Sequence, residues 1–432
     1  MNAAAPFLPP MSPSLFALTL ALLLIAPLAL AGVALINTGL SRSRSAAQAM
    51  LGSLVIIAIS AIVFALAGLC LTGAPGFGFL AVNASGRDWD LIGWAPSLLR
   101  GFALAAPHTQ LTAIFEFLSV AMAALIPWGS GADRLRLAGG CAIAVLLSVL
   151  VFPLVAHWIW SGGWLAQLGG YFGLGSGFLD PGGAAAVHVL GGLSALAVVW
   201  ITGPRRGKFP KEGLSTALPG HNASYVLFGC FIAFAGWMAW NVAGAALWLH
   251  APLAALPATA VGTLLSAAGA LAATFLVTRI RFGKPDASLC ANGWLAGLVA
   301  SSACAALVSP GVSLFVGLVA GVVSPLLVEL LELALSIDDP SGAIAVHAAA
   351  GLWGLFAAGV FAPRTGQLLA QLVGIAALLG VVLPLVYLIF ALLNRIVPFR
   401  VDPDGERLGM DLHELGGSAY PEFVIHRDES FR

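Results

Sequence analysis

Two histidines occupy equivalent places in an internal repeat of the sequence. The segment DPGGAAAVHVLGGLSAL, which begins at Asp180, places His188 eight residues after an aspartate, and the segment DPSGAIAVHAAAGLWGL, which begins at Asp339, does the same with His347. The segments align without gaps at an offset of 159 residues, and ten of seventeen positions are identical. Because a neutral imidazole carries one hydrogen-bond donor and one acceptor, such a pair can bind a small polar molecule or pass on a proton.

The composition indicates the environment in which these histidines lie. Hydrophobic residues make up 60% of the 432-residue chain and charged residues only 9%, whereas soluble domains carry about 25% charged residues. The chain is therefore predicted to be an all-α polytopic membrane protein. A formal net charge of zero gives no reason to expect a nucleic-acid partner. The five cysteines form no CxxC pair, so we interpret them as packing residues and expect neither a metal site nor a cofactor.

Stretches without charged residues predict eleven transmembrane helices, since a membrane span needs about 20 apolar residues. The segment 73–109 contains Arg87, Asp88, Asp90 and Arg100 and is predicted to be a loop. The predicted spans are 13–41, 46–72, 110–128, 137–160, 182–202, two within 213–278, two within 287–328, then 341–362 and 367–395.

The distribution of basic residues predicts the orientation of these spans. With the N-terminus outside, the inner loops carry eleven positive charges, and the outer loops carry only Arg87, Arg100 and Arg364. Cytoplasmic loops are the ones that carry excess Lys and Arg. The N-terminus is therefore predicted to lie outside, and the C-terminal tail in the cytoplasm.

This topology inverts the two copies of the repeat. Asp180 and Asp339 are five predicted spans apart, and an odd number reverses the direction. We therefore predict a transmembrane domain, 1–395, built from two inverted five-helix repeats, about 13–202 and 223–362, followed by an eleventh helix, 367–395, and a tail, 396–432. Inverted repeats place a binding site near the middle of the membrane.

The spacing within each repeat predicts the depth of the histidines. Eight helical residues span about 12 Å, so both rings reach towards the middle of a layer about 30 Å thick. A single buried histidine could equally well bond a neighbouring carbonyl or hydroxyl group. Asp180 and Asp339 are interpreted as helix caps or as carboxylates that attract a cation.

With these features the sequence resembles the ammonium transporter (Amt/Rh) family, most closely its bacterial members. The resemblance runs from about Gly32 to Phe423 and includes the twin Asp-Pro helices with their histidines, AHWIW at 156–160, GW-x-x-W-N at 236–241 and GMDLHELGGSAY in the tail. The family implies eleven spans, an N-out and C-in topology, a homotrimer with one pore per subunit, and a tail that meets PII-type signalling proteins.

The resemblance also implies roles for individual residues. His188 and His347 match the two pore histidines, and Asp180 matches an aspartate near the outer ammonium site. Trp160 matches a tryptophan that faces the cation in a cation–π contact. Asn241 matches an asparagine beside the inner aromatic gate and, like Asp339, is assigned a structural role.

Several positions depart from the family pattern. The family stacks two phenylalanines above the histidines, and here they are matched by Ser119 and Trp240. Gly244 replaces a serine of the outer site, and the family's His-Gly-Glu in the tail becomes Leu415-Gly416-Gly417. Glu116 stands where the family has an uncharged residue. It is either a paired carboxylate of the third span or a vestibule residue that binds ammonium, and Ser119, Trp240 and Glu116 are included in the predicted substrate site.

These features favour a transporter of ammonium or methylammonium in a prokaryotic plasma membrane. The alternatives are an ammonium receptor that binds without conducting, and a channel for neutral ammonia. The residues that depart from the family pattern in the vestibule are the reason to retain the receptor as an alternative. Trp160 favours recruitment of a cation and so argues against a channel for neutral ammonia. An enzyme is least favoured, because the sequence contains no P-loop, metal-ligand cluster or nucleophile–base set.

Overall fold

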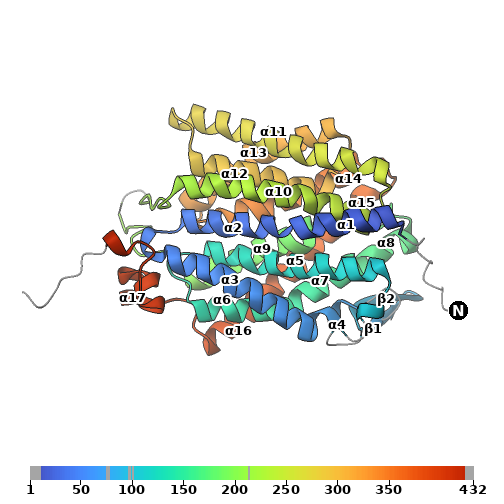
Figure 1. Ribbon diagram of the computed structural model, residues 1–432, viewed down its shortest axis with the longest axis horizontal. Coiled ribbons are helices and arrows are strands. Elements are labelled where there is room, and N and C mark those ends of the chain that lie inside the picture. The colour runs from blue at the N-terminus through green and yellow to red at the C-terminus, as the bar shows by residue number, and fades with distance from the viewer. Residues whose placement is uncertain (1–10, 74–77, 96–98, 100–101, 213–214, 424–432) are drawn as a thin grey trace, which may run out of the picture.

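The computed structural model describes residues 11–73, 78–95, 99, 102–212 and 215–423. Eleven helices within these residues are long and apolar enough to cross a membrane, which confirms the predicted number of spans. Figure 1 shows them lying side by side along the long axis of the molecule. Large apolar side chains such as Leu24, Phe231 and Ile280 are more than two-thirds exposed on the outside of the bundle, as expected for a surface that faces lipid.

The first half of the chain contains α1 (Pro13–Ile25), α2 (Pro27–Leu40), α3 (Ala46–Val63), α4 (Leu69–Thr72), α5 (Pro107–Ser130), α6 (Leu137–Leu146), α7 (Phe152–Ile159), α8 (Trp164–Phe172) and α9 (Leu190–Thr202). The second half contains α10 (Ala223–Trp248), α11 (Leu256–Phe282), α12 (Ala287–Cys304), α13 (Pro310–Leu333), α14 (Ala350–Phe361), α15 (Gln367–Ala377), α16 (Leu383–Ile396) and α17 (Pro403–Leu408). Three of the described spans join two of these helices through a π-helical turn, at Phe64–Gly68, Leu147–Val151 and Leu378–Val382. Two further π-helical turns open their spans: Ala184–Val189 precedes α9 and Ile344–Ala349 precedes α14.

The segment 73–109, predicted to be a loop, instead contains a β-hairpin and the start of a helix. Strands β1 (Gly78–Ala84) and β2 (Arg87–Gly93) pair antiparallel through a tight turn at Ser85 and Gly86, whose φ angles are 55° and 72°. Positive φ at both central residues is the geometry that two-residue hairpins favour. Helix α5 already begins at Pro107. Arg100 lies outside the described residues.

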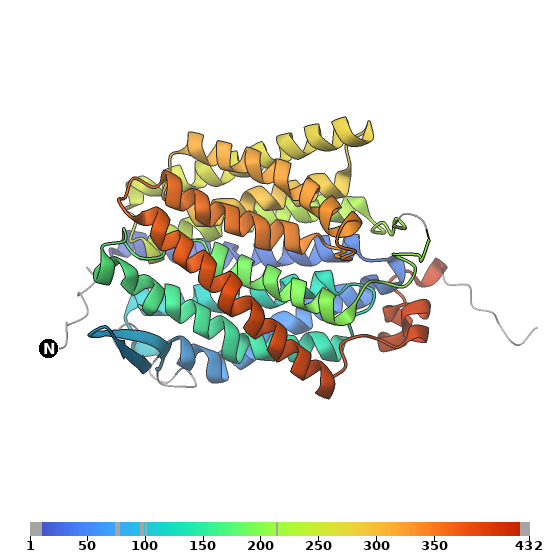
Figure 2. The ribbon, with the colours of Figure 1, turned by 180° about the vertical axis from the view of Figure 1, so that it is seen from behind.

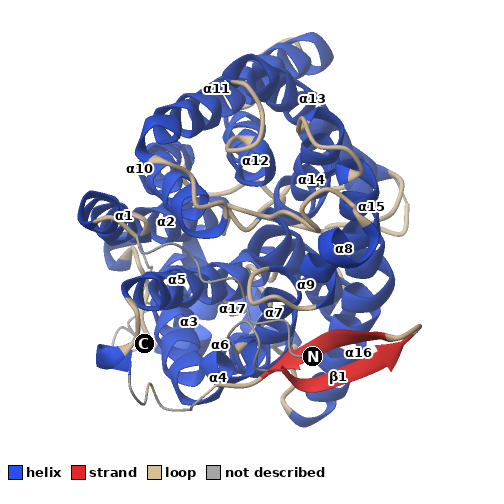
Figure 3. Ribbon diagram, turned by 90° about the vertical axis from the view of Figure 1, so that its right-hand side faces the viewer, coloured by secondary structure: helices blue, strands red, loops and turns tan. Residues whose placement is uncertain are grey.

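The two ends of the bundle differ in what they carry. Figure 1 places β1, β2 and α1 at one end, called here the hairpin end, and α17 at the other, called the tail end. Figure 3 views the hairpin end and shows the helices end-on, with the hairpin lying across one side. Figure 2 shows the last span, α15–α16, crossing the outside of the bundle obliquely.

Two glycines let the histidine-bearing helices approach closely. A Cβ atom on Gly192 of α9 would overlap the backbone nitrogen of Ala348, and one on Gly351 of α14 would lie 2.7 Å from Cγ2 of Val189. Each glycine follows its own histidine by four residues, and each contacts the residue that follows the other histidine. The two contacts are therefore equivalent under the inverted repeat, and they set the distance between the two halves.

Candidate functional site

The two predicted histidines meet inside the bundle. The ring centroids of His188 and His347 are 5.3 Å apart and their planes are inclined by 25°. Their side chains are almost fully buried, with 1% and 4% exposure. Within the described residues, neither Nδ1 atom has a hydrogen-bond partner. The ring of Trp237 on α10 stacks on His188 at 4.8 Å. This leaves a pair of buried imidazoles with free hydrogen-bonding capacity.

The two aspartates hold the histidine-bearing turns in place. The Asp180 Oδ2 atom accepts hydrogen bonds of 2.9 Å from the backbone N–H groups of Ala185 and Ala186. The Asp339 Oδ2 atom accepts one of 2.8 Å from the N–H of Ile344. In both copies a carboxylate thus receives an N–H five residues further along the chain. It satisfies donors at a helix start that have no partner within the helix.

The helix starts lie later than the sequence suggested. The Asp-Pro dipeptide was predicted to open each helix, but the helical turns begin at Ala184 and Ile344. Glycines with positive φ, Gly183 at 80° and Gly342 at 68°, turn the chain between the aspartate and the helix. The side chain of Asp180 therefore reaches across a turn, and its second oxygen, Oδ1, has no partner among the described residues. That oxygen can accept a hydrogen bond from a ligand.

Four aromatic rings form a cluster between the histidines and the hairpin end. The ring of Phe115 on α5 lies 5.5 Å from Trp160, 5.3 Å from Trp240 and 5.9 Å from Trp248, each time edge to face. Trp160 and Trp248 are stacked with an interplanar angle of 6°. We refer to Phe115, Trp160, Trp240 and Trp248 as the aromatic cluster. Two predicted site residues, Trp160 and Trp240, thus lie together.

Phe115 and Trp248 were not predicted as site residues. Helical spacing could have indicated both residues. Phe115 lies four residues before Ser119, and Trp248 lies eight residues after Trp240, so each shares a helix face with a predicted site residue. The indole nitrogen of Trp160 donates to the carbonyl oxygen of Asp180 at 2.8 Å, which fixes the Trp160 ring.

The structure gives physical reasons for two departures from the family pattern. A Cβ atom on Gly244 would overlap the carbonyl oxygen of Pro181, so α10 can pack against the turn after Asp180 only if residue 244 is glycine. The hydroxyl group of Ser119 donates to the carbonyl oxygen of Phe115 at 2.8 Å, within its own helix. Ser119 is fully buried and supplies no ring at this position.

Glu116 and Asn241 lie in contrasting surroundings. Glu116 on α5 is only 5% exposed, and no side chain within the described ranges forms a hydrogen bond or ion pair with it. Asn241 on α10 donates from Nδ2 to the hydroxyl oxygens of Thr263 and Ser301, at 3.1 and 3.0 Å. Asn241 therefore ties α10 to α11 and α12, which supports a structural role, whereas Glu116 is an unpaired carboxyl group.

An ionic cluster fixes the tail end of the two histidine-bearing spans. Arg205, which follows α9, donates to both carboxylate oxygens of Asp338 at 2.9 Å and to Asp133 at 3.0 Å. Asp338 immediately precedes Asp339. Burial acts to raise the pKa of Asp338, but the hydrogen bonds of Arg205 and the charges of Arg134 and Arg205 outweigh it and hold the pKa below its usual range.

A cavity of about 240 Å³ opens beside this cluster at the tail end. Charged and polar side chains from several elements line it, including Arg205, Lys208, Asn292, Glu332 and Asp339. Lys208 and Glu332 form a 2.7 Å ion pair across its wall. The cavity thus leads from the solvent at this end towards the start of the turn that carries His347.

The tail binds the ends of two transmembrane helices. Asp411 accepts hydrogen bonds from the backbone N–H groups of Ala47 and Gln48 at the start of α3, and Glu414 accepts from the N–H of Leu137 at the start of α6. Carboxylates at helix N-termini satisfy free N–H groups and interact favourably with the helix dipole. Glu414 also accepts from the amide of Gln48.

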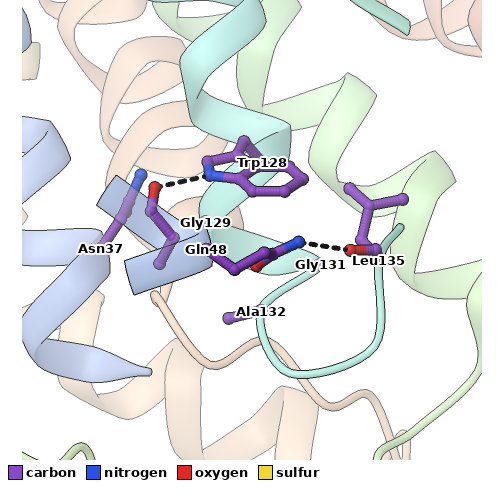
Figure 4. Close-up of a pocket in the computed structure, with 8 residues that line it drawn as sticks. Asn37, Gln48, Trp128, Gly129, Gly131, Ala132 and Leu135 are labelled. Atoms are coloured by element: carbon purple, nitrogen blue, oxygen red, sulfur yellow. Dashed lines mark hydrogen bonds between the residues drawn. The ribbon is translucent and has the colours of Figure 1, made fainter. Parts of the chain in front are cut away.

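A small enclosed cavity lies next to this contact and carries no chemistry of its own. Its volume is about 10 Å³, near the minimum for a single water molecule. Figure 4 shows that Gln48 and Trp128, which line it, already donate to the carbonyl oxygens of Leu135 and Ala49. This cavity is therefore too small and too well satisfied to be a candidate for the substrate site.

The inverted halves and the buried histidine pair define a polytopic helical membrane protein with a polar site enclosed between two repeats. Residues 15–420 match the model of the Ammonium Transporter Family. The chain is 33% identical over 428 residues to the ammonium transporter Amt2 of Archaeoglobus fulgidus, which covers 92% of this chain and 86% of that protein. It is 30% identical over 408 residues to an ammonium transporter of Bacillus subtilis, with 90% and 94% covered. The chain therefore belongs to the ammonium transporter family.

Solved structures agree with this assignment. A protein described as "Sensor Amt Protein" superposes with a TM-score of 0.83 at 26% identity, covering 93% of this chain and 98% of that one. Mep2 of Candida albicans superposes with a TM-score of 0.76 at 25% identity, covering 96% and 91%. The fold predicted from the sequence, eleven transmembrane helices in two inverted repeats, is confirmed.

Proposed function

We propose that this chain carries ammonium across a prokaryotic plasma membrane, with ammonium or methylammonium as substrate. The hairpin end lies outside and the tail end in the cytoplasm. The basic residues support this orientation, because Arg134, Arg205 and Lys208 gather at the tail end. The transmembrane domain comprises 1–395 and the cytoplasmic tail 396–432.

The pathway begins at the aromatic cluster and Asp180. A cation is attracted by the faces of aromatic rings, by roughly 0.5–2 kcal/mol, and the free Asp180 Oδ1 atom can accept a hydrogen bond from ammonium. An ion cannot cross the apolar interior cheaply. Ammonium can transfer a proton to the Asp180 carboxylate or to water at the hairpin end and continue as neutral ammonia, whereas potassium has no such form.

The observation that carries the proposal is the histidine pair. Two buried rings 5.3 Å apart, each with an Nδ1 atom that lacks a partner in the described part of the chain, can accept from or donate to ammonia as it passes. Two inverted elements deliver these rings to one place, which is the arrangement of a transport site.

Current from proteoliposomes on a solid-supported membrane tests this proposal. An ammonium pulse should give a transient current and a potassium pulse should not. The double variant His188→Ala with His347→Ala should lose the ammonium current. Current that persists in the double variant would remove the histidine pair from the mechanism.

A receptor is the second candidate, and two observations favour it. The stacking of Trp248 on Trp160 narrows the approach to the site, and the structure described as a sensor Amt protein is similar over most of its length. Saturable ammonium binding without current would establish a receptor. Internal alkalinisation without current would instead establish a channel for neutral ammonia.

The tail and the subunit arrangement are further parts of the proposal. We expect a homotrimer with one pore per subunit, and a PII-type signalling protein that binds near the tail. Native mass spectrometry of the detergent-solubilised protein tests the trimer. Co-purification with the host's PII protein, compared between the full chain and a chain ending at residue 402, tests the partner.

A further inference from the structure

The indole nitrogen of Trp240 is a buried donor without a protein acceptor. The side chain is 3% exposed, and Nε1 has no hydrogen-bond partner among the described residues. Five other indoles donate to carbonyl or hydroxyl oxygens, namely those of Trp128, Trp158, Trp160, Trp237 and Trp353. The indole nitrogens of Trp248 and Trp294 also lack a partner among the described residues, but only Trp240 lies within one helical turn of the residue that stacks on His188. Buried polar groups in proteins are nearly always paired, so an unpaired one in a functional region calls for an explanation.

Trp240 is the member of the aromatic cluster that lies next to the histidine pair along α10. It follows Trp237, whose ring stacks on His188, by three residues of α10. Three helical residues advance about 4.5 Å towards the hairpin end. On the other side, the ring of Phe115 lies 5.3 Å from that of Trp240. Trp240 therefore contacts one ring of the cluster and lies one helical turn from the residue that stacks on His188.

The indole N–H distinguishes the two forms of the substrate. An indole nitrogen only donates a hydrogen bond. Ammonium has four N–H bonds and no lone pair, so it cannot accept that bond, and a potassium ion cannot either. Neutral ammonia has one lone pair and can accept it. The ring face of a tryptophan attracts a cation, whereas its N–H edge binds only a species with a lone pair.

We infer that the Trp240 N–H binds the lone pair of neutral ammonia and thereby selects the uncharged substrate before it reaches the histidine pair. A phenylalanine at this position would offer no such donor. The inference rests on the proposed transport function. Water also has lone pairs, so the experiment must separate ammonia from water.

Trp240→Phe is the decisive variant, since it keeps an aromatic ring and removes the donor. Ammonium flux in proteoliposomes should fall roughly fivefold, the usual effect of losing one neutral hydrogen bond. The matched control is Trp353→Phe, because the Trp353 indole donates to the carbonyl oxygen of Val316. That variant should stay within about twofold of the original flux. The Trp353 N–H is already bonded to a protein acceptor, so its removal takes no donor away from the substrate.

Ultraviolet resonance Raman spectroscopy supplies a second readout, because an indole band reports hydrogen bonding at Nε1. At fixed total ammonium, a rise in pH increases neutral ammonia, and the band of the unmodified protein should shift. The shift should be absent from Trp240→Phe and from samples at the same pH without ammonium. If Trp240→Phe does not fold, the pH titration of the unmodified protein, with and without ammonium, still tests whether ammonia binds to an indole N–H.

The outcomes separate this inference from the proposed function. Normal flux in Trp240→Phe, or a Raman band that ammonia does not shift, overturns the role of Trp240 and leaves transport standing. A shift that follows pH without ammonium assigns the site to water and also overturns it. No flux in the unmodified protein, with an ammonia-dependent shift, refutes transport and retains the binding site.

Discussion

Trp248 lies parallel to Trp160, with ring centroids 5.0 Å apart and an interplanar angle of 6°. The sequence predicted that Trp160 offers its face to a cation, and in the structure a second indole lies against that ring. The edge of Phe115 approaches both rings. A cation therefore reaches the face of Trp160 that Trp248 covers only if Trp248 moves, or it binds to the opposite face of Trp248 instead.

Removal of Trp248 should make the Trp160 ring accessible. Trp248→Ala is expected to strengthen the apparent affinity for ammonium by about two- to fivefold, because an additional cation–π contact at a partly exposed site contributes about 0.5–1 kcal/mol. The concentration dependence of the ammonium-induced current measures this change. Trp248→Phe, which retains a ring, serves as the control, and weaker affinity in Trp248→Ala would identify Trp248 itself as the recruiting ring.

A methyl group at Gly192 should separate the two histidine-bearing helices. Gly192→Ala places a Cβ atom against the backbone of Ala348, and such overpacking costs about 1–3 kcal/mol. We expect a lower melting temperature in detergent and loss of ammonium current. Gly170→Ala on α8 is the matched control, because nothing lies within 4 Å of the added atom. If both variants behave alike, the close contact does not hold the pair together.

The buried carboxyl group of Glu116 should lower the stability of the folded protein, and it should take part in ammonium binding if it lines the vestibule. Glu116→Gln is expected to raise the melting temperature, since a buried ionisable group without a partner is unfavourable. If Glu116 lines the vestibule, the same change also alters the apparent affinity for ammonium or its pH dependence. Unaltered uptake kinetics together with higher stability would assign Glu116 no part in transport.

The ion pair between Arg205 and Asp338 should stabilise the tail end of the bundle. Asp338→Asn leaves Arg205 without its bidentate partner, and breaking a buried pair costs about 3–5 kcal/mol. Asp338 has a lowered pKa in the folded protein. The stabilisation from ionised Asp338 is therefore complete above its pKa in the unfolded chain, about 3.9. It is lost as the pH falls through the lower pKa of the folded protein.

Thermal unfolding at a series of pH values checks that the stabilisation by Asp338 is lost as the pH falls. Asp338→Asn should melt well below the unmodified protein at neutral pH, and the difference should narrow only below about pH 4. Asp404→Asn is the control, because Asp404 and its partner Arg407 are about four-fifths exposed. Such surface pairs contribute little. Equal melting temperatures for the two variants at neutral pH would contradict the role of Asp338.

The tail should detach when its capping carboxylates are removed. Asp411→Ala with Glu414→Ala leaves the N–H groups of Gln48 and Leu137 without these acceptors, and the loss of one cap costs about 0.5–2 kcal/mol. We expect limited proteolysis to cleave the tail after residue 396 several times faster. Cleavage at an unchanged rate would mean that other contacts between the tail and the bundle, such as the hydrogen bond from Arg400 to the carbonyl oxygen of Thr202, hold the tail.

Much of the architecture was predictable because a membrane restricts the choices. Charge-free stretches gave the number of spans, and the offset between His188 and His347 gave the inversion. The hairpin at 78–93 was missed, because its strands carry charged residues within a segment that charge counting assigns to a loop. The helix starts were misplaced because glycines with positive φ separate Asp180 and Asp339 from their helices.

The site was predictable only in part, because its members come from several helices. The repeat identified His188 and His347, but no local pattern indicates that Trp248 would stack on a residue of another span. Gly244 looked like the loss of a serine, whereas the closeness of Pro181 leaves no room for a side chain there. Tertiary contacts of this kind depend on how spans pack, and a single sequence does not specify that packing.

The equivalence of the Gly192 and Gly351 contacts bears on the direction of flow. The two glycines occupy matched places around the histidine pair, with His188 and His347 exchanged, so the crossing of the two helices by itself favours neither direction. A preference for inward movement would therefore come from features that the repeat does not share, such as the Trp237 ring on His188 and the unlike ends of the bundle, or from the gradient and the membrane potential.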